Sequence, residues 1–226
     1  MNKISKIVGA VCITSMSMIG SSFADSSAFT GAYVAVSGSA IGVALTGTHT
    51  KTLGGDLSSK GAVGAVENSA GLEAGFSYPV SDMAFITVGV GYTPFSADIK
   101  ASDVTEAKDI KLATDDMLSV FIEPSFNVTE NSAVFLKVGY SESEVTASGT
   151  EVTNKTYAFD GTTIALGTKT IADNGLFIKT EAGVTDYSSI NIKNIREEFN
   201  GTATFTASAK ADVEVAYGQV TLGYKF

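Results

Sequence analysis

The chain offers few side chains that could carry out catalysis. Its only histidine, His49, stands between two threonines in a polar stretch. A histidine that acts as a base needs an orienting acid and a nucleophile within hydrogen-bond reach. Asp56, Ser58 and Ser59 follow His49, but their spacing matches no catalytic pattern. We interpret His49 as a solvated residue and expect a protein that is not an enzyme.

A second polar stretch contains acids that could attract a cation. Its aspartates are Asp103, Asp109, Asp115 and Asp116. They lack the fixed spacing of a calcium-binding loop, and lysines are interleaved with them. The sequence therefore predicts neither a metal site nor a cofactor.

Six other ionisable residues stand in runs where apolar residues alternate with small ones. They are Glu73, Glu123, Lys137, Lys169, Lys179 and Glu181. Each lies roughly four to six residues from a short turn, so in tilted strands rising ~3.3 Å per residue they would form one band. Three acids and three lysines balance, and an unpaired buried charge is costly. We predict an internal ion-pair network; the alternative is a constriction that guides ions through a pore.

The elements that would position these charges are β-strands, because the runs alternate with a period of two. Clear examples are residues 70–78, 118–126 and 134–140. Short turns are expected at residues 79–82, 129–131 and 173–175, the last containing Asn-Gly, a favourable hairpin turn. Long polar stretches separate the hairpins at residues 40–66, 93–116, 142–160 and 188–211.

Short turns at one end and long connections at the other are typical of outer-membrane barrels. Three short turns, with both chain ends on the same side, give eight strands. The sequence thus predicts an all-β, eight-stranded antiparallel up-and-down transmembrane β-barrel with short periplasmic turns and long extracellular loops. The pattern of the first strand, around residues 33–38, does not indicate which face points outward.

The two faces of the predicted strands differ in polarity. One carries Leu, Val, Ile, Phe and Tyr, and the other carries small residues and the six charges. A narrow barrel needs small or satisfied polar residues inside, so the apolar face would meet lipid. The glycines expected inside are Gly71, Gly75, Gly89, Gly91, Gly139, Gly167, Gly183 and Gly223.

The first residues are typical of a signal peptide. Lys3 and Lys6 precede an uncharged apolar run at 7–19, and Ala24 ends a stretch suited to signal-peptidase cleavage. We predict that residues 1–24 are removed and that residues 25–226 form the barrel. The formal charge of the whole chain is −9, which argues against binding to nucleic acid.

Three segments resemble the opacity-type, porin-like family of small outer-membrane barrels: residues 122–126, 135–141 and 220–226. The resemblance implies location in the bacterial outer membrane, in contact with its lipid. It also implies that Leu222, Tyr224 and Phe226 form the signal read by the outer-membrane assembly machinery. It specifies architecture and not activity.

We therefore expect a non-enzymatic outer-membrane protein with a lumen filled by side chains. It would serve membrane integrity or surface interaction, with an extracellular ligand contacting its loops. A narrow solute or ion pore and a lipid-modifying enzyme using His49 are the two alternatives.

Overall fold

The structure, a computed structural model, describes residues 26–52, 56–94, 98–101, 110–114, 116–149, 155–199 and 203–226. The predicted signal peptide lies outside these residues. Within the described part of the chain, no helix is long and apolar enough to cross a membrane.

A short 3-10 helix, η1 (Ser26–Phe29), precedes the strands. The strands that the structure describes are β1 (Gly31–Thr52), β2 (Asp56–Ser81), β3 (Ala84–Thr93), β4 (Asp98–Ala101), β5 (Ile110–Thr114), β6 (Met117–Thr129), β7 (Ser132–Gly149), β8 (Lys155–Ile171), β9 (Leu176–Phe199) and β10 (Ala203–Lys225).

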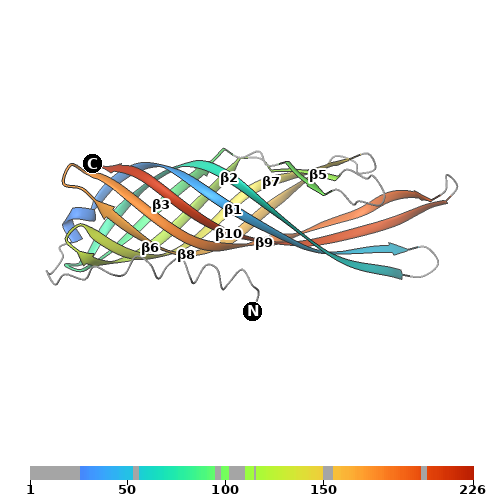
Figure 1. Cartoon of the computed structure of the whole chain (residues 1–226), viewed down its shortest axis with the longest axis horizontal. Helices are drawn as coiled ribbons and strands as arrows, with labels where there is room; N and C mark the ends of the chain where they lie inside the picture. Colours follow the sequence, from blue (N-terminus) through green and yellow to red (C-terminus); the bar gives the residue numbers. More distant parts are fainter. Residues whose placement is uncertain are drawn as a thin grey trace.

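Eight of these strands close into an antiparallel barrel (Figure 1). Each is paired with its neighbours in the chain, in the order β1, β2, β3, β6, β7, β8, β9 and β10. The pairing of β1 with β10 joins the two ends of the sheet. The predicted eight-stranded up-and-down barrel is confirmed.

The facing of the first strand, which its sequence pattern did not indicate, is fixed by its two partners. Tyr33 is opposite Lys225 on one side and Gly75 on the other. The Tyr33 side chain is buried in the lumen, whereas Val34 and Val36 are 50% and 56% exposed on the outside. The strand therefore continues the alternation of its neighbours.

The glycines predicted to point inward make room for aromatic rings. A Cβ atom at Gly75 would lie 2.7 Å from the Tyr33 ring. The same crowding occurs at three other glycines, each directly opposite an inward aromatic residue in the adjacent strand. These pairs are Gly89 with Phe121, Gly167 with Phe135, and Gly223 with Phe177. Glycine across from an aromatic residue lets a ring lie flat on the inner wall.

In the described part of the chain the long polar stretches are mostly continued strand, so they extend the sheet in place of the long loops expected. Pairing of β1 with β2 continues to Thr52 and Asp56, and pairing of β9 with β10 continues to Phe199 and Ala203. Polar sequence does not prevent this, because antiparallel pairing satisfies backbone N–H and C=O groups whatever the side chains are.

Beyond the barrel, these continuations form an outer sheet. We define it as residues 42–52 of β1, 56–66 of β2, 188–199 of β9 and 203–216 of β10. Its order is β2–β1–β10–β9, and it projects away from the end that holds the C-terminus (Figure 1). A second extension contains the outer parts of β7 and β8 with the β4–β5 hairpin paired onto β7.

Candidate functional site

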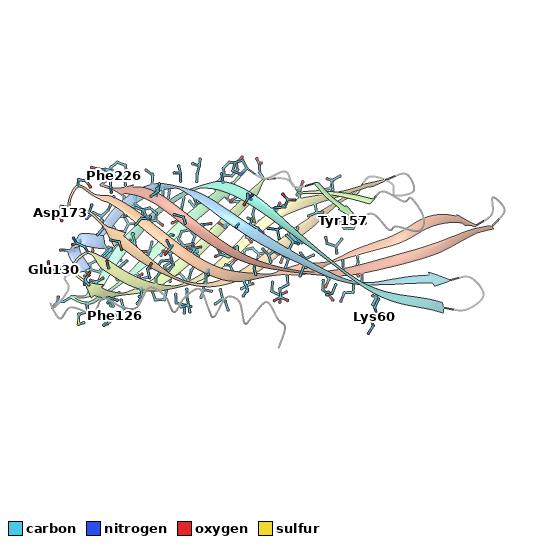
Figure 2. The ribbon with its side chains drawn as sticks, viewed as in Figure 1. Lys60, Phe126, Glu130, Tyr157, Asp173 and Phe226 are labelled. Carbon is cyan, nitrogen blue, oxygen red and sulfur yellow. The ribbon has the colours of Figure 1, made fainter. Side chains whose placement is uncertain are left out.

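The end of the barrel with the short turns is closed by the N-terminal segment. Glu130, Asp173 and Phe226 all lie at this end (Figure 2). The backbone N–H of Ser26 donates to the carbonyl of Asp82 at 2.7 Å, and its hydroxyl donates to the carbonyl of Ser81 at 2.8 Å. These bonds hold η1 against the β2–β3 turn.

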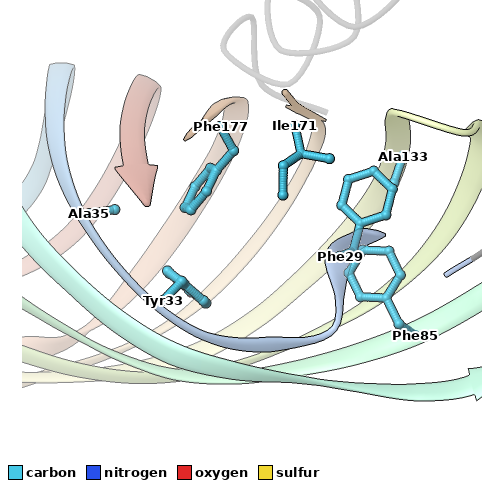
Figure 3. Close-up of a cluster of buried hydrophobic side chains, with 7 residues drawn as sticks. All are labelled: Phe29, Tyr33, Ala35, Phe85, Ala133, Ile171 and Phe177. Atoms are coloured by element: carbon cyan, nitrogen blue, oxygen red, sulfur yellow. The ribbon is translucent and has the colours of Figure 1, made fainter. Parts of the chain in front are cut away.

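Phe29 then enters the lumen and stacks on Phe85, with ring centroids 5.0 Å apart and an interplanar angle of 8°. Both rings are almost completely buried. They belong to an apolar cluster completed by Tyr33, Ala35, Ala133, Ile171 and Phe177 (Figure 3). This cluster fills the lumen at the short-turn end.

Five of the six predicted lumen charges meet in one ion-pair cluster above these apolar residues. The ion-pair cluster consists of Glu73, Glu123, Lys137, Lys179 and Glu181, all of them buried. Each of the two lysine Nζ atoms lies within 4.0 Å of a carboxylate oxygen of every one of the three glutamates. The closest pairs are Lys179 with Glu73 at 2.6 Å and Lys137 with Glu181 at 2.7 Å.

Two tyrosines complete the hydrogen bonding of the ion-pair cluster. Tyr33 donates to Glu73 Oε1 at 2.7 Å, and Tyr217 donates to Glu181 Oε1 at 3.0 Å. Both ammonium groups lie over the face of the Phe121 ring, with its centroid 4.5 Å from Lys137 Nζ and 5.4 Å from Lys179 Nζ. Such close pairing and hydrogen bonding are what allow charges to be buried.

The sixth predicted charge, Lys169, is not part of the ion-pair cluster. Its Nζ lies over the rings of Tyr33 and Phe177, at 4.8 and 4.5 Å from their centroids. Cation–π attraction to two aromatic faces replaces the expected carboxylate partner. The ion-pair cluster thus holds three acids and two lysines, a formal charge of −1, and not the balanced set of three and three predicted.

A chamber lies on the other side of the ion-pair cluster, toward the outer sheet. It has a volume of about 120 Å³, and Lys137 and Glu181 form part of its floor. Phe121 and Tyr217 also line it. Much of its wall consists of hydroxyl side chains on many strands: Ser37, Ser39, Ser119, Ser141, Thr163 and Thr185.

A cluster of apolar residues, here called the apolar cap, borders the chamber where the outer sheet meets the β7–β8 extension. Its core is Val145, Phe159, Ile190 and Val213, with Val43, Tyr157, Tyr187 and Val215 packed against it. Tyr187 and Val215 line the chamber as well, so the two features are contiguous. Phe159 and Tyr187 stack with centroids 4.2 Å apart. The lumen is therefore layered: apolar plug, ion-pair cluster, polar chamber and apolar cap.

The residues of the predicted assembly signal lie on the outside of the last strand. Leu222, Tyr224 and Phe226 are 57%, 43% and 72% exposed. The N–H of Phe226 donates to the carbonyl of Ala32 at 3.0 Å, so the chain end is paired with the start of β1. These residues form part of the outward apolar belt.

The residues weighed for catalysis and the one described aspartate weighed for cation binding lie in different parts of the chain. His49 lies on β1, opposite Ser59 on β2. Asp116 accepts a hydrogen bond from the Tyr92 hydroxyl at 2.5 Å, and Asp103, Asp109 and Asp115 lie outside the described residues. Among the residues described, no group of three or more His, Cys, Asp or Glu side chains could hold a metal ion.

Sequence reasoning missed the aromatic members of the lumen. Tyr33, Tyr217 and Phe121 complete or support the ion-pair cluster, but they resemble any apolar strand residue in the sequence. A usable signal exists in the pairing, because Phe121 is opposite Gly89 and Tyr217 is opposite Gly183. An aromatic residue directly opposite a glycine in the adjacent strand indicates a ring that faces the lumen.

No family model and no curated protein matches the chain. Solved structures similar to it include Ail, the attachment invasion locus protein of Yersinia pestis, at 13% identity over 85% of this chain and 99% of that one, with a TM-score of 0.42. The transport unit of the Escherichia coli autotransporter AIDA-I is 9% identical over the whole of both chains, with a TM-score of 0.44. The outer membrane protease OmpT from Escherichia coli is 9% identical over 87% of this chain and 97% of that one, with a TM-score of 0.40.

Proposed function

We propose that the protein is a non-enzymatic integral protein of the bacterial outer membrane, related to the opacity-type barrels. Its lumen would be closed to the passage of solutes from one side of the membrane to the other, and its outer sheet would make contacts at the cell surface. The membrane location is supported by the outside of the barrel, where large apolar side chains are exposed on all eight strands. In water this belt would be a very large apolar patch, whereas in lipid it is solvated.

The observation that carries the closed lumen is the ion-pair cluster. Five charged side chains from four different strands, β2, β6, β7 and β9, meet at its centre, and a conducting path would have to separate their ion pairs. The plug around Phe29 adds a second barrier on the short-turn side. A barrel of eight strands has an interior just wide enough for side chains to fill.

Planar-bilayer recording tests the closed lumen against the pore alternative. We expect the purified protein, shown to be folded by a change of gel migration on boiling, to give no steady conductance. Replacing Phe29 by Ala serves as a probe of the plug, and this variant should remain closed because the ion-pair cluster is intact. Steady open channels in the unaltered protein, with a conductance that changes in Glu123→Gln, would establish a pore instead.

Surface contact is supported by the direction of the outer sheet. It extends from the end opposite the short turns, and in the outer membrane short turns face the periplasm. Protease added to intact cells should therefore cleave within the outer sheet and leave a protected barrel fragment. A fragment pattern in which the turns near Glu130 and Asp173 are cut from outside would reverse the orientation.

The absence of catalysis is also a proposal with its own test. His49→Ala should leave the lipids of the membrane unchanged by mass spectrometry, and the purified protein should release no lipid or peptide product.

For the C-terminal segment, Phe226→Ser should reduce the amount of folded protein in the outer membrane if Leu222, Tyr224 and Phe226 are the assembly signal. Thr168→Ser on the outside of β8 is a matched control.

A further inference from the structure

The chamber between the ion-pair cluster and the apolar cap has room that its own side chains do not use. Its volume is about 120 Å³, and one water needs roughly 10–15 Å³ of such space. We propose that the chamber is a binding site for a small neutral polyol, between glycerol and a single hexose in size. The site lies outward of the ion-pair cluster and does not depend on whether the lumen conducts.

The hydrogen bonding of the chamber wall is incomplete. The Ser141 hydroxyl is buried, and it has no hydrogen-bond partner among the described residues. The neighbouring Tyr187 hydroxyl donates to the thioether of Met117, at 3.2 Å, and sulfur is a weak acceptor. A buried hydroxyl without a partner is unfavourable, so a ligand that supplies one would be favoured.

The hydroxyl side chains of the wall favour a ligand that both donates and accepts hydrogen bonds. Serine and threonine hydroxyls can do either. The hydroxyl oxygens of Thr163 and Thr185 are 2.8 Å apart, for example, and either one can be the donor. A polyol has the same dual character on each of its hydroxyls. Its C–H faces can pack on the aromatic side chains that line the chamber, Phe121 and Tyr217.

The floor of the chamber selects against charged ligands. Lys137 donates to both carboxylate oxygens of Glu181, at 2.8 and 2.7 Å. The charges of the two groups therefore already satisfy each other and are not available to pair with a charged ligand. The formal charge of −1 on the ion-pair cluster repels an anion, and Lys137 repels a cation. An apolar ligand would leave the Ser141 hydroxyl without a partner, which a site built from hydrogen-bonding groups disfavours.

Amide NMR of the isotope-labelled barrel in detergent micelles tests the proposal. Glycerol and then glucose are titrated, with the zwitterion betaine as the control solute. We expect saturable shifts of the amides of Ser141, Thr163 and Thr185, and none at the turns near Glu130 and Asp173. Shifts that rise linearly without saturation, or equal shifts with betaine, would overturn the proposal.

Variants then locate the binding. Ser119→Phe fills the chamber and should abolish the saturable shifts, and Ser141→Ala should weaken binding about five- to tenfold, as expected for one lost hydrogen bond. Ser132→Ala is a matched control, because Ser132 is on the same strand but pairs with Thr170 at the short-turn end. If Ser119→Phe does not fold, Thr163→Val replaces it, since it removes a wall hydroxyl with almost no change in volume. Unchanged affinity in the folded wall variants would refute the site.

Discussion

In the barrel body every strand is paired on both sides, whereas in the outer sheet β2 and β9 each have one partner among the described residues. The difference extends to the side chains. Each barrel residue lies either among apolar and charged groups in the lumen or on the apolar outside. In the outer sheet, water is expected on at least one face and along both edges. The effect of a substitution there should therefore depend less on which residue is changed. We expect substitutions in the body to have large and strongly position-dependent effects, and those in the outer sheet to have small ones.

The largest effect is expected from removing a cation of the ion-pair cluster. Lys179→Met leaves three buried carboxylates with one lysine and should destabilise the barrel by about 3–5 kcal/mol, the usual cost of breaking a buried ion pair. Urea titration in lipid vesicles, followed by the gel shift of the folded form, measures it.

Lys169→Met is the matched control for that variant. It removes contacts to two aromatic rings and no ion pair, so a loss of about 2 kcal/mol or less is expected. Equal losses for the two lysines would contradict the distinction between Lys169 and the ion-pair cluster.

The next effect comes from adding a single methyl group on the inner wall. Gly167→Ala places a Cβ against the ring of Phe135 and the carbonyl of Thr180. Overpacking of this kind typically costs about 1–3 kcal/mol.

Gly64→Ala in the outer sheet is its counterpart. There the added Cβ meets only the carbonyl of Val43, at 3.7 Å, an ordinary contact. It should leave the free energy of unfolding unchanged or slightly raise it, because alanine restricts the unfolded chain. A larger loss for Gly64→Ala than for Gly167→Ala would break the comparison between the two regions.

A smaller effect is expected when the ion-pair cluster loses an acid. Glu123→Gln brings its formal charge from −1 to zero and leaves each lysine with two carboxylates. The loss should be about 1 kcal/mol, close to the net contribution of one hydrogen bond. The same urea titration measures it, and a loss as large as that of Lys179→Met would show that total charge does not govern the ion-pair cluster.

The smallest effect is expected at the base of the outer sheet. The hydroxyl of Ser189 donates to Asp212 at 2.5 Å, and with Lys210 nearby it holds the pKa of Asp212 below its ordinary value. A lowered pKa in the folded state means that the stabilisation is present above the ordinary pKa of the carboxyl. It is lost as the pH falls through the lowered value.

Hydrogen exchange of the amides around Ser189 measures this local effect. Protection of these amides against exchange should decrease on acidification below about pH 4. In Ser189→Ala the protection should depend less on pH. No dependence on pH in the unaltered protein would mean that the contact does not stabilise the outer sheet.

Much of the fold could be predicted because each barrel strand has two distinct environments. Alternation along residues 118–126 and 134–140 indicated both the strands and the side that faces out, as the exposed Leu118, Val120 and Ile122 show. The long polar stretches could not be assigned in this way, since pairing of their backbones does not require an apolar face. The sequence does not separate Lys169 from the ion-pair cluster, because distance from a turn gives the height of a residue in the barrel but not the direction of its side chain.

The sequence by itself determined the barrel, its strand number and the identity of the inward charges. Those features depend on the two-residue alternation of polarity within each strand and on the residue types in the turns, both of which can be read from short stretches of sequence. Only the tertiary structure decided which charges meet, how β1 pairs and where the lumen keeps an unfilled space. These depend on the stagger of strands far apart in sequence: Lys179 reaches Glu73 and Glu123 only when the sheet closes. Closure is a property of the whole sheet, and no single strand carries it.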